Sequence, residues 1–272
     1  MIRPLILPIC GAALLALAQV PAEAPDCRGH PNALGTERVL AVDPAVTPAV
    51  GRKHFPVTLP LKPREVVLTF DDGPWPGTTD AVLAALREQC VKASFFMLGR
   101  NAAAHPALAR RVMAEGHTVA HHTYSHPLLS HMSLPRAEAE IDRGFAAVDQ
   151  AVYGSGGRVP KTPFFRFPGF ASSAPLLGLL AKRRIAVFGA DFWASDWNPM
   201  SPQQQRALVL DRLVHAGGGI VLFHDTHAQT AKMIPDFLRD LKRLGYRVVH
   251  VVPASSVADA GTALSTLVNG TH

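Results

Sequence analysis

The sequence predicts an α/β fold, a distorted (β/α) barrel with about seven parallel strands. After Pro63, short apolar runs alternate with longer amphipathic segments, which is the pattern of repeated β-α units. The chain has 272 residues, 48% of them hydrophobic, which is enough for one sizeable core. No glycine-rich dinucleotide fingerprint follows the first predicted strand, so a barrel is favoured over an open doubly wound sheet.

Each predicted strand is a short apolar run, rich in β-branched or aromatic residues and too short for a helix. In chain order these runs are 66–70, 93–97, 118–120, 164–166, 185–188, 220–223 and 247–251.

The amphipathic segments between the strands have apolar residues at helical spacing. Gly116 and Gly245 follow two of them, where a left-handed cap residue is expected. Pro202 falls in a first turn with Ser201 as a candidate cap. The predicted helices are 79–89, 102–115, 134–151, 174–182, 202–215 and 230–244.

The first 24 residues have the pattern of a secretory signal peptide. Arg3 gives a positive start, an apolar run covers residues 5–18, and both Ala16-Leu17-Ala18 and Ala22-Glu23-Ala24 are candidate motifs for cleavage after their last residue. The run is shorter than the ~20 residues that a membrane-spanning helix needs, and Pro8 interrupts it. We therefore expect export to the periplasm or the extracellular space, with no stable membrane insertion after cleavage.

The remaining chain divides into three segments. Residues 25–63 are rich in Pro, Ala and Val and are predicted to form an extended N-terminal arm. Residues 64–253 form the predicted barrel domain, and residues 254–272 a small polar C-terminal tail. Signal cleavage would leave Cys27 and Cys90, which could pair in an oxidising compartment. Alternatively, Cys90 is a small buried apolar residue, and the sequence leaves both interpretations open.

The charge pattern argues against nucleic acid as a partner. The formal net charge is +6, but the basic residues are dispersed, and the tightest cluster is Lys182, Arg183 and Arg184. A nucleic-acid-binding surface would need a denser basic stripe with interleaved aromatic residues. We interpret most of these charges as solvated helix faces.

Reactive side chains collect at one end of the predicted strands. In a βα barrel the carboxyl ends of the strands form one face, and that face holds the active site. The residues that follow predicted strands are Asp71, Asp72, His122, His126, Arg166, Asp191, Asp196, Trp197 and His224.

Two histidines and one carboxylate from this face predict a metal site. His122 and His126 are four residues apart, so one turn can place both rings on one side. Such a pair alone is more often incidental, but with an Asp it forms a usual three-ligand set for a catalytic divalent metal. One of Asp71 and Asp72 would bind the ion, and the other would take a proton from water that the ion activates. Arg166 would pair with that base, because the phenylalanines around it indicate burial.

His224 follows a strongly apolar strand. A general acid that protonates a leaving amine is the second titratable group that hydrolysis of an amide requires. Asp196 could hold the His224 ring and raise its pKa. The alternative is a satisfied core histidine.

Five motifs, in order, then show a resemblance to a known family. They are TFDDGP, H-[ST]-x-x-H-P, R-x-P, D-W and L-x-H-D, and they lie between residues 65 and 253. This order resembles the polysaccharide deacetylases, carbohydrate esterase family four, with a nodulation-protein-B-type domain. The resemblance implies a distorted βα barrel and one divalent metal, usually zinc with cobalt as a second choice. It also implies hydrolysis of N-acetyl groups on chitin-like or peptidoglycan-like glycans.

The resemblance also implies a role for each motif residue. Asp71 resembles the catalytic base, with Arg166 as its partner, and His224 resembles the general acid, with Asp196 as its tuning partner. Asp72, His122 and His126 match the metal ligands. In the same comparison the backbone N–H of Gly169 helps to hold the oxyanion, and Trp197 and Leu222 form walls of the acetate pocket.

Three positions depart from the family pattern. His121 stands where Asn is frequent, and Gly169 stands where an aromatic residue often follows the proline. In the D-W motif the family usually has an acidic residue three positions before the Asp. Here no acidic residue stands three positions before Asp196, and Asp191 lies further back. These departures keep the chemistry and leave the substrate open. Two alternatives remain: a related amide or imide hydrolase acting on a small molecule, and a catalytically inert glycan-binding module.

Overall fold

The computed structural model describes residues 30–256. The predicted signal peptide, the start of the arm, Cys27 and most of the C-terminal tail lie outside these residues. Cys90 is disulfide-bonded. Among the described residues, no helix has the length and apolar character to cross a membrane.

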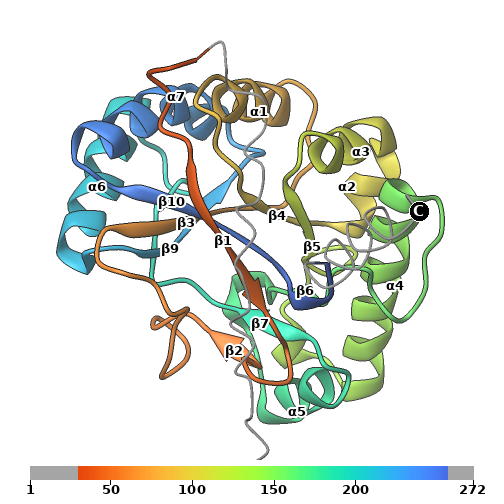
Figure 1. Cartoon of the computed structure of the whole chain (residues 1–272). Helices are drawn as coiled ribbons and strands as arrows, with labels where there is room; N and C mark the ends of the chain where they lie inside the picture. The colour runs from red at the N-terminus through yellow and green to blue at the C-terminus, as the bar shows by residue number, and fades with distance from the viewer. Residues whose placement is uncertain (1–29, 257–272) are drawn as a thin grey trace, which may run out of the picture.

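A ring of parallel strands forms the centre of the molecule (Figure 1). β3 (Glu65–Asp71) pairs with β9 (Gly219–His224) on one side and with β4 (Ser94–Met97) on the other. From β4 the order continues through β5 (Thr118–His121), β6 (Phe164–Phe165) and β7 (Ala186–Phe188). β8 (Phe192–Trp193) follows β7 along the chain and pairs with β9. The chain itself thus closes the ring between β7 and β8, which confirms the predicted distorted barrel.

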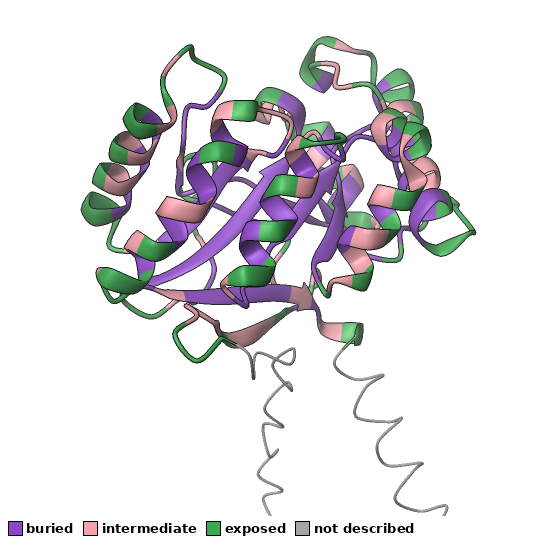
Figure 2. Cartoon of the chain, turned by 90° about the horizontal axis from the view of Figure 1, so that it is seen from above, coloured by how far each residue is buried: buried purple, intermediate pink, exposed green. Residues whose placement is uncertain are grey.

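Helices cover the outside of this ring, with exposed residues on their outer sides (Figure 2). The helices are α1 (Thr78–Glu88), α2 (Gly99–Ala104), α3 (Pro106–Ala114), α4 (Leu134–Tyr153), α5 (Ala174–Lys182), α6 (Pro202–Ala216) and α7 (Ala228–Arg243). Their apolar residues pack on the strands in two clusters: one includes Val82, Phe95, Phe223 and Phe237, and the other, around α5 and part of α4, includes Phe145 and Leu180.

The arm contributes two strands that the sequence did not predict. β1 (Thr36–Val42) pairs in parallel with β10 (Arg247–Pro253), and β2 (Ala49–Val50) pairs with β7. Val42 and Val50 belong to the inner apolar cluster, together with Val67 and Ile220 of the ring. Residues 36–50 are therefore built into the same sheet and core as the barrel.

One predicted helix was wrong as a single element. Residues 102–115 were expected to be continuous, but the structure has α2 and α3, which meet at His105. The residue before a proline is disfavoured in helical conformation, and a proline is suited to a first helical turn, so Pro106 starts a new helix. The cap prediction at Ser201 is confirmed, since its side chain accepts from the N–H of Gln204. Gly116 and Gly245 have positive φ values of 81° and 71°, as expected.

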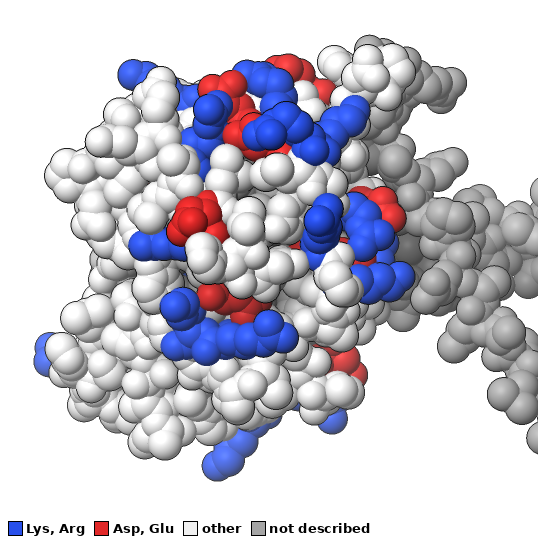
Figure 3. Space-filling model, turned by 90° about the vertical axis from the view of Figure 1, so that its left-hand side faces the viewer, with Lys and Arg blue, Asp and Glu red and all other residues white. Residues whose placement is uncertain are grey.

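Charged side chains of both signs are interspersed on the side of the molecule shown in Figure 3. Surface ion pairs among the described residues include Arg206 with Asp236 and Arg243 with Asp240.

Candidate active site

The adjacent carboxylates lie where β3 ends. Asp71 is 2% exposed and is the last residue of the strand, in register with His224 of β9. At Asp72 the φ angle is 77°, so the backbone turns between the two carboxylates. The side-chain amide of Asn101 donates to the Asp72 carbonyl at 2.7 Å and holds the turn.

A third carboxylate, Asp225, holds this turn through a hydrogen bond to the residue that follows Asp72. It is fully buried, and its oxygens accept from the N–H of Gly73 at 3.1 Å and from the hydroxyl of Thr79 at 2.5 Å. A Cβ on Gly73 would lie 2.1 Å from Asp225 Oδ2, so only glycine fits here. Burial raises the pKa of Asp225 to about 7. Asp225 is the last residue of the L-x-H-D motif, and the motif alone predicts no role for it.

The three predicted metal ligands come together. The Nε2 atoms of His122 and His126 each lie 3.5 Å from Asp72 Oδ1, and the donor atoms of all three residues lie within 4.8 Å of one another. Tetrahedral zinc holds its ligand atoms about 3.3 Å apart. Asp72 Oδ1 is buried and has no hydrogen-bond partner among the described residues, which is the state of an oxygen that binds a cation. The donor set therefore fits a divalent metal ion.

The ring of His122 is fixed for this task. Its Nδ1–H donates to the carbonyl oxygen of Arg166 at 2.8 Å, which leaves Nε2 as the free acceptor nitrogen facing Asp72. Burial lowers the pKa of His122 to about 3, so the imidazole is neutral at physiological pH. Metal binding requires that neutral form.

Asp71 forms a buried ion pair with Arg166. The Arg166 side chain is fully buried, and its Nη1 lies 2.7 Å from Asp71 Oδ1. The other guanidinium hydrogen bonds go to the Thr69 hydroxyl and to the carbonyls of Phe188 and Gly189. Burial raises the pKa of the Asp71 carboxyl, and the Arg166 charge counteracts this rise. The predicted contact between the two residues is present.

A second pair joins His224, whose side chain is 13% exposed, to the buried Asp196. The Nδ1 atom of His224 lies 2.8 Å from Asp196 Oδ1, and the other Asp196 oxygen accepts from the His224 N–H and the Thr230 hydroxyl. Burial lowers the pKa of His224, but the hydrogen bond and charge of Asp196 outweigh burial and raise the pKa to about 9. Gln205 donates in turn to Thr230 at 2.9 Å. Sequence reasoning missed Thr230 and Gln205, because neither belongs to a motif.

Of the three expected substrate-side residues, Trp197 and Leu222 lie close to His224. Trp197 is 47% exposed, with its ring centroid 5.8 Å from that of His224. Leu222, two residues before His224 on β9, is buried. Gly169 is exposed with a φ angle of 55°, and a Cβ there would lie 2.9 Å from the side chain of Leu128.

The structure shows the contacts of two positions that depart from the family pattern, Asp191 and His121. The Asp191 carboxylate accepts from the N–H groups of Arg52 and Ile220 and from the Thr58 hydroxyl, so it ties the arm to the start of β9. The expectation that Asp191 lies with the site residues at the carboxyl ends of the strands is therefore wrong. His121 is fully buried, and its Nε2 lies 3.7 Å from Asp149 Oδ1.

Comparison with known proteins identifies the family. The family model for polysaccharide deacetylase matches residues 58–185. A chitin deacetylase of Colletotrichum lindemuthianum is 32% identical over 218 residues, which cover 74% of this chain and 85% of that protein. The chain belongs to the polysaccharide deacetylase family. Within this family it is also 30% identical over 218 residues to a peptidoglycan-N-acetylglucosamine deacetylase of Listeria monocytogenes, covering 76% of this chain.

Solved structures of the family agree with the fold. A peptidoglycan deacetylase of Bdellovibrio bacteriovorus matches with a TM-score of 0.71 and 32% identity, covering 82% of this chain and 61% of that chain. A family 4 carbohydrate esterase from Streptomyces lividans, solved with acetate, matches with a TM-score of 0.56 and 32% identity, covering 70% and 91%. The matched region spans only 43% of the Listeria enzyme, less than half its length.

Proposed function

We propose that this chain is an exported, metal-dependent hydrolase that removes N-acetyl groups from amino-sugar polymers or oligomers of the chitin or peptidoglycan type. The observation that carries the proposal is the clustering, at one end of the barrel, of a three-residue metal ligand set and two acid–base pairs. Family relatives named as peptidoglycan and chitin deacetylases support this substrate class.

The ligand set would hold one divalent ion, for which we propose zinc, with cobalt as a substitute. Asp72, His122 and His126 are the three ligands. When bound, such an ion supplies a Lewis acid that polarises a carbonyl oxygen and lowers the pKa of water towards ~7.

Asp71 acts as the general base. Arg166 holds Asp71 Oδ1, while Oδ2 lies 3.8 Å from His122 Nε2 and faces the ligand set. Burial raises the pKa of Asp71, which makes its carboxylate a stronger base towards the attacking water. Arg166 fixes the carboxylate and favours its ionised form.

His224 acts as the general acid. With its pKa raised to about 9, the ring carries a proton at neutral pH and can transfer it to the departing amine nitrogen. The backbone N–H of Gly169 donates to the oxyanion of the tetrahedral intermediate, where a preorganised donor contributes most. Trp197 and Leu222 enclose the acetyl methyl group.

Acetate release tests this function. The zinc-loaded protein should release acetate from N-acetylglucosamine oligomers or peptidoglycan strands, and a chelator should stop the reaction until zinc or cobalt is added back. Asp71→Asn should lower the rate by at least ~10²-fold and keep the metal. Asp236→Asn, a change of the same kind on the surface of α7, should keep the rate. No acetate from any of these glycans, with zinc or cobalt present, would refute the function.

Export is tested separately. Expression of the full chain in a Gram-negative host should give periplasmic or secreted protein that begins close to residue 25. Full-length protein that stays in the cytoplasm would contradict the signal-peptide assignment.

A further inference from the structure

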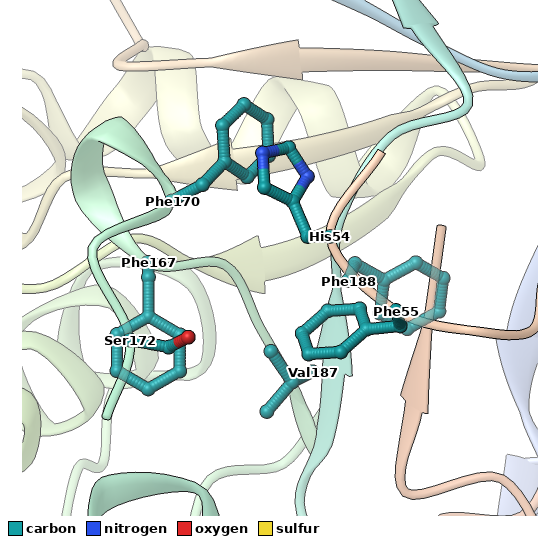
Figure 4. A pocket seen from close by; sticks show the side chains of 7 residues that line it. All are labelled: His54, Phe55, Phe167, Phe170, Ser172, Val187 and Phe188. Atoms are coloured by element: carbon teal, nitrogen blue, oxygen red, sulfur yellow. The ribbon is translucent and has the colours of Figure 1, made fainter. Parts of the chain in front are cut away.

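A row of aromatic rings leads from the N-terminal arm to the general acid. The rings of His54 and Phe170 stack with centroids 3.8 Å apart and 19° between planes (Figure 4). Phe170 lies 6.2 Å from Trp193, Trp193 lies 6.0 Å from Trp197, and Trp197 lies 5.8 Å from His224. Because Phe170 directly follows Gly169, the row borders the site where the family often has an aromatic residue and this chain has glycine.

The arm residues in this row are held firmly. The N–H of Lys53 donates to the carbonyl of Ala190 at 3.0 Å, and the N–H of Gly51 donates to that of Val57 at 2.9 Å. The Asp191 carboxylate binds the arm at Arg52 and Thr58. Backbone hydrogen bonds and a buried carboxylate thus fix Lys53 and His54 against the segment between β7 and β8.

Lys53 has no carboxylate partner among the described residues. Its Nζ lies 5.3 Å from the Trp193 ring centroid, and the residue is exposed. A neighbouring hollow of about 460 Å³ lies in the size range of ligand sites. It is lined by Lys53, Asp191, Phe192, Trp193, Asp211, Arg212, His215 and Ala216.

The other charges of the hollow have partners. Asp191 accepts three hydrogen bonds, and Asp211 lies 3.5 Å from His215. The Arg212 guanidinium donates to the Trp193 carbonyl and the Ser195 hydroxyl. Among the described residues that line the hollow, Lys53 is therefore the cation whose charged group makes no hydrogen bond or ion pair, so it can bind an incoming anion.

We propose that His54, Phe170 and Trp193 form a second sugar subsite, next to the one that holds the reacting acetamide, and that Lys53 binds a carboxylate on that second sugar. The inference rests on the proposed deacetylase function and narrows its substrate to acidic glycans. A glycan in which every second amino sugar carries a lactyl ether, as in peptidoglycan strands, has the required carboxylate. A chitin oligomer can stack on the rings but offers Lys53 no anion.

Binding measured without turnover tests the subsite. The zinc-loaded Asp71→Asn protein is titrated calorimetrically with an N-acetylglucosamine tetramer and with a tetramer in which alternate sugars carry the lactyl ether. We expect the acidic tetramer to bind roughly 3–5-fold more tightly at low salt, as for an exposed ion pair, and this advantage to shrink at high salt. Lys53→Met should remove the advantage, while His54→Ala should weaken both ligands.

Lys182→Ala removes an exposed lysine in the last turn of α5 and should leave the ratio unchanged. Equal binding of the two tetramers, a ratio that survives Lys53→Met, or no binding of either tetramer would each overturn the inference. The deacetylase function depends on acetate release by the wild-type protein and is judged separately.

Discussion

Replacing Asp196 by Asn should lower the pKa of His224 and remove the general acid. Asp196 is 1% exposed, and its carboxylate contacts the His224 ring at 2.8 Å and the His224 N–H at 2.6 Å. Burial alone lowers the pKa of His224, and the contact with Asp196 is the largest influence that raises it. Asn keeps the shape and an acceptor oxygen but has no charge, so we expect a neutral His224 at pH 7.

The size of the effect follows from the pKa of His224. A rise from the ordinary 6.5 to about 9 corresponds to about 3 kcal/mol of interaction with the protonated ring. Because the folded-state pKa is above the unfolded value, this stabilisation is complete below pH 6.5 and is lost as the pH rises through about 9. The free energy of unfolding of the wild-type protein should therefore fall by up to about 3 kcal/mol as the pH rises from 6.5 to about 9. That of Asp196→Asn should not show this fall.

Histidine NMR titration and urea unfolding of the chelated protein measure both quantities. Thr230→Val removes one neutral donor from Asp196 and should change the His224 pKa far less than Asp196→Asn. Asp236→Asn, at a 48% exposed surface carboxylate, should leave it unchanged. If His224 kept a pKa near 9 in folded Asp196→Asn protein, the assigned cause of the raised pKa would be wrong.

Three further changes test other contacts of the site. His126→Ala should weaken zinc binding, measured by competition with a chelating dye. The loss should exceed the ~10–100-fold that is typical when a residue hydrogen-bonded to a metal ligand is removed, and unchanged affinity would exclude His126 as a ligand. Gly73→Ala places a Cβ 2.1 Å from Asp225 Oδ2 and should lower the free energy of unfolding by ~1–3 kcal/mol in urea, whereas Gly178→Ala, with open space around it, should not. Arg166→Met leaves a buried carboxylate unpaired and should cost ~3–5 kcal/mol at pH 8 by urea unfolding, and a smaller loss than 1 kcal/mol would argue against the buried pair.

The sequence was sufficient to predict most of the residues that meet at the site, with Asp191 as the exception, because its carboxylate binds at the start of β9. Apolar runs mark the strands, and parallel strands in a barrel end on one face, so residues such as Asp71, His122 and His224 had to converge. The register of β3 with β9 confirms this, because it sets Asp71 directly beside His224. The same reasoning predicted a two-histidine, one-carboxylate ligand set and both ion pairs, whereas the choice of Asp72 over Asp71 as the ligand rested on the family resemblance.

Contacts that depend on long-range pairing were not predictable. The many prolines of the arm gave no strand pattern for β1 and β2. These strands form because they pair with β10 and β7, which lie far along the chain. β8 has only two residues and leaves no periodic pattern to detect. Asp225 was visible within a motif, but only the fold shows that its carboxylate meets Gly73.

The balance of charge in the site explains why so many ionisable groups can share one strand-end cluster. Arg166 neutralises Asp71, and His224, protonated at neutral pH, neutralises Asp196, so each pair adds little net charge to the interior. Asp72 is different, since among the described residues its carboxylate meets only the rings of His122 and His126 and no lysine or arginine. An anionic oxygen beside two imidazole nitrogens is a site for a cation, and a divalent ion is the partner that this balance of charge favours. The metal dependence that we propose thus follows from electrostatics as well as from ligand type.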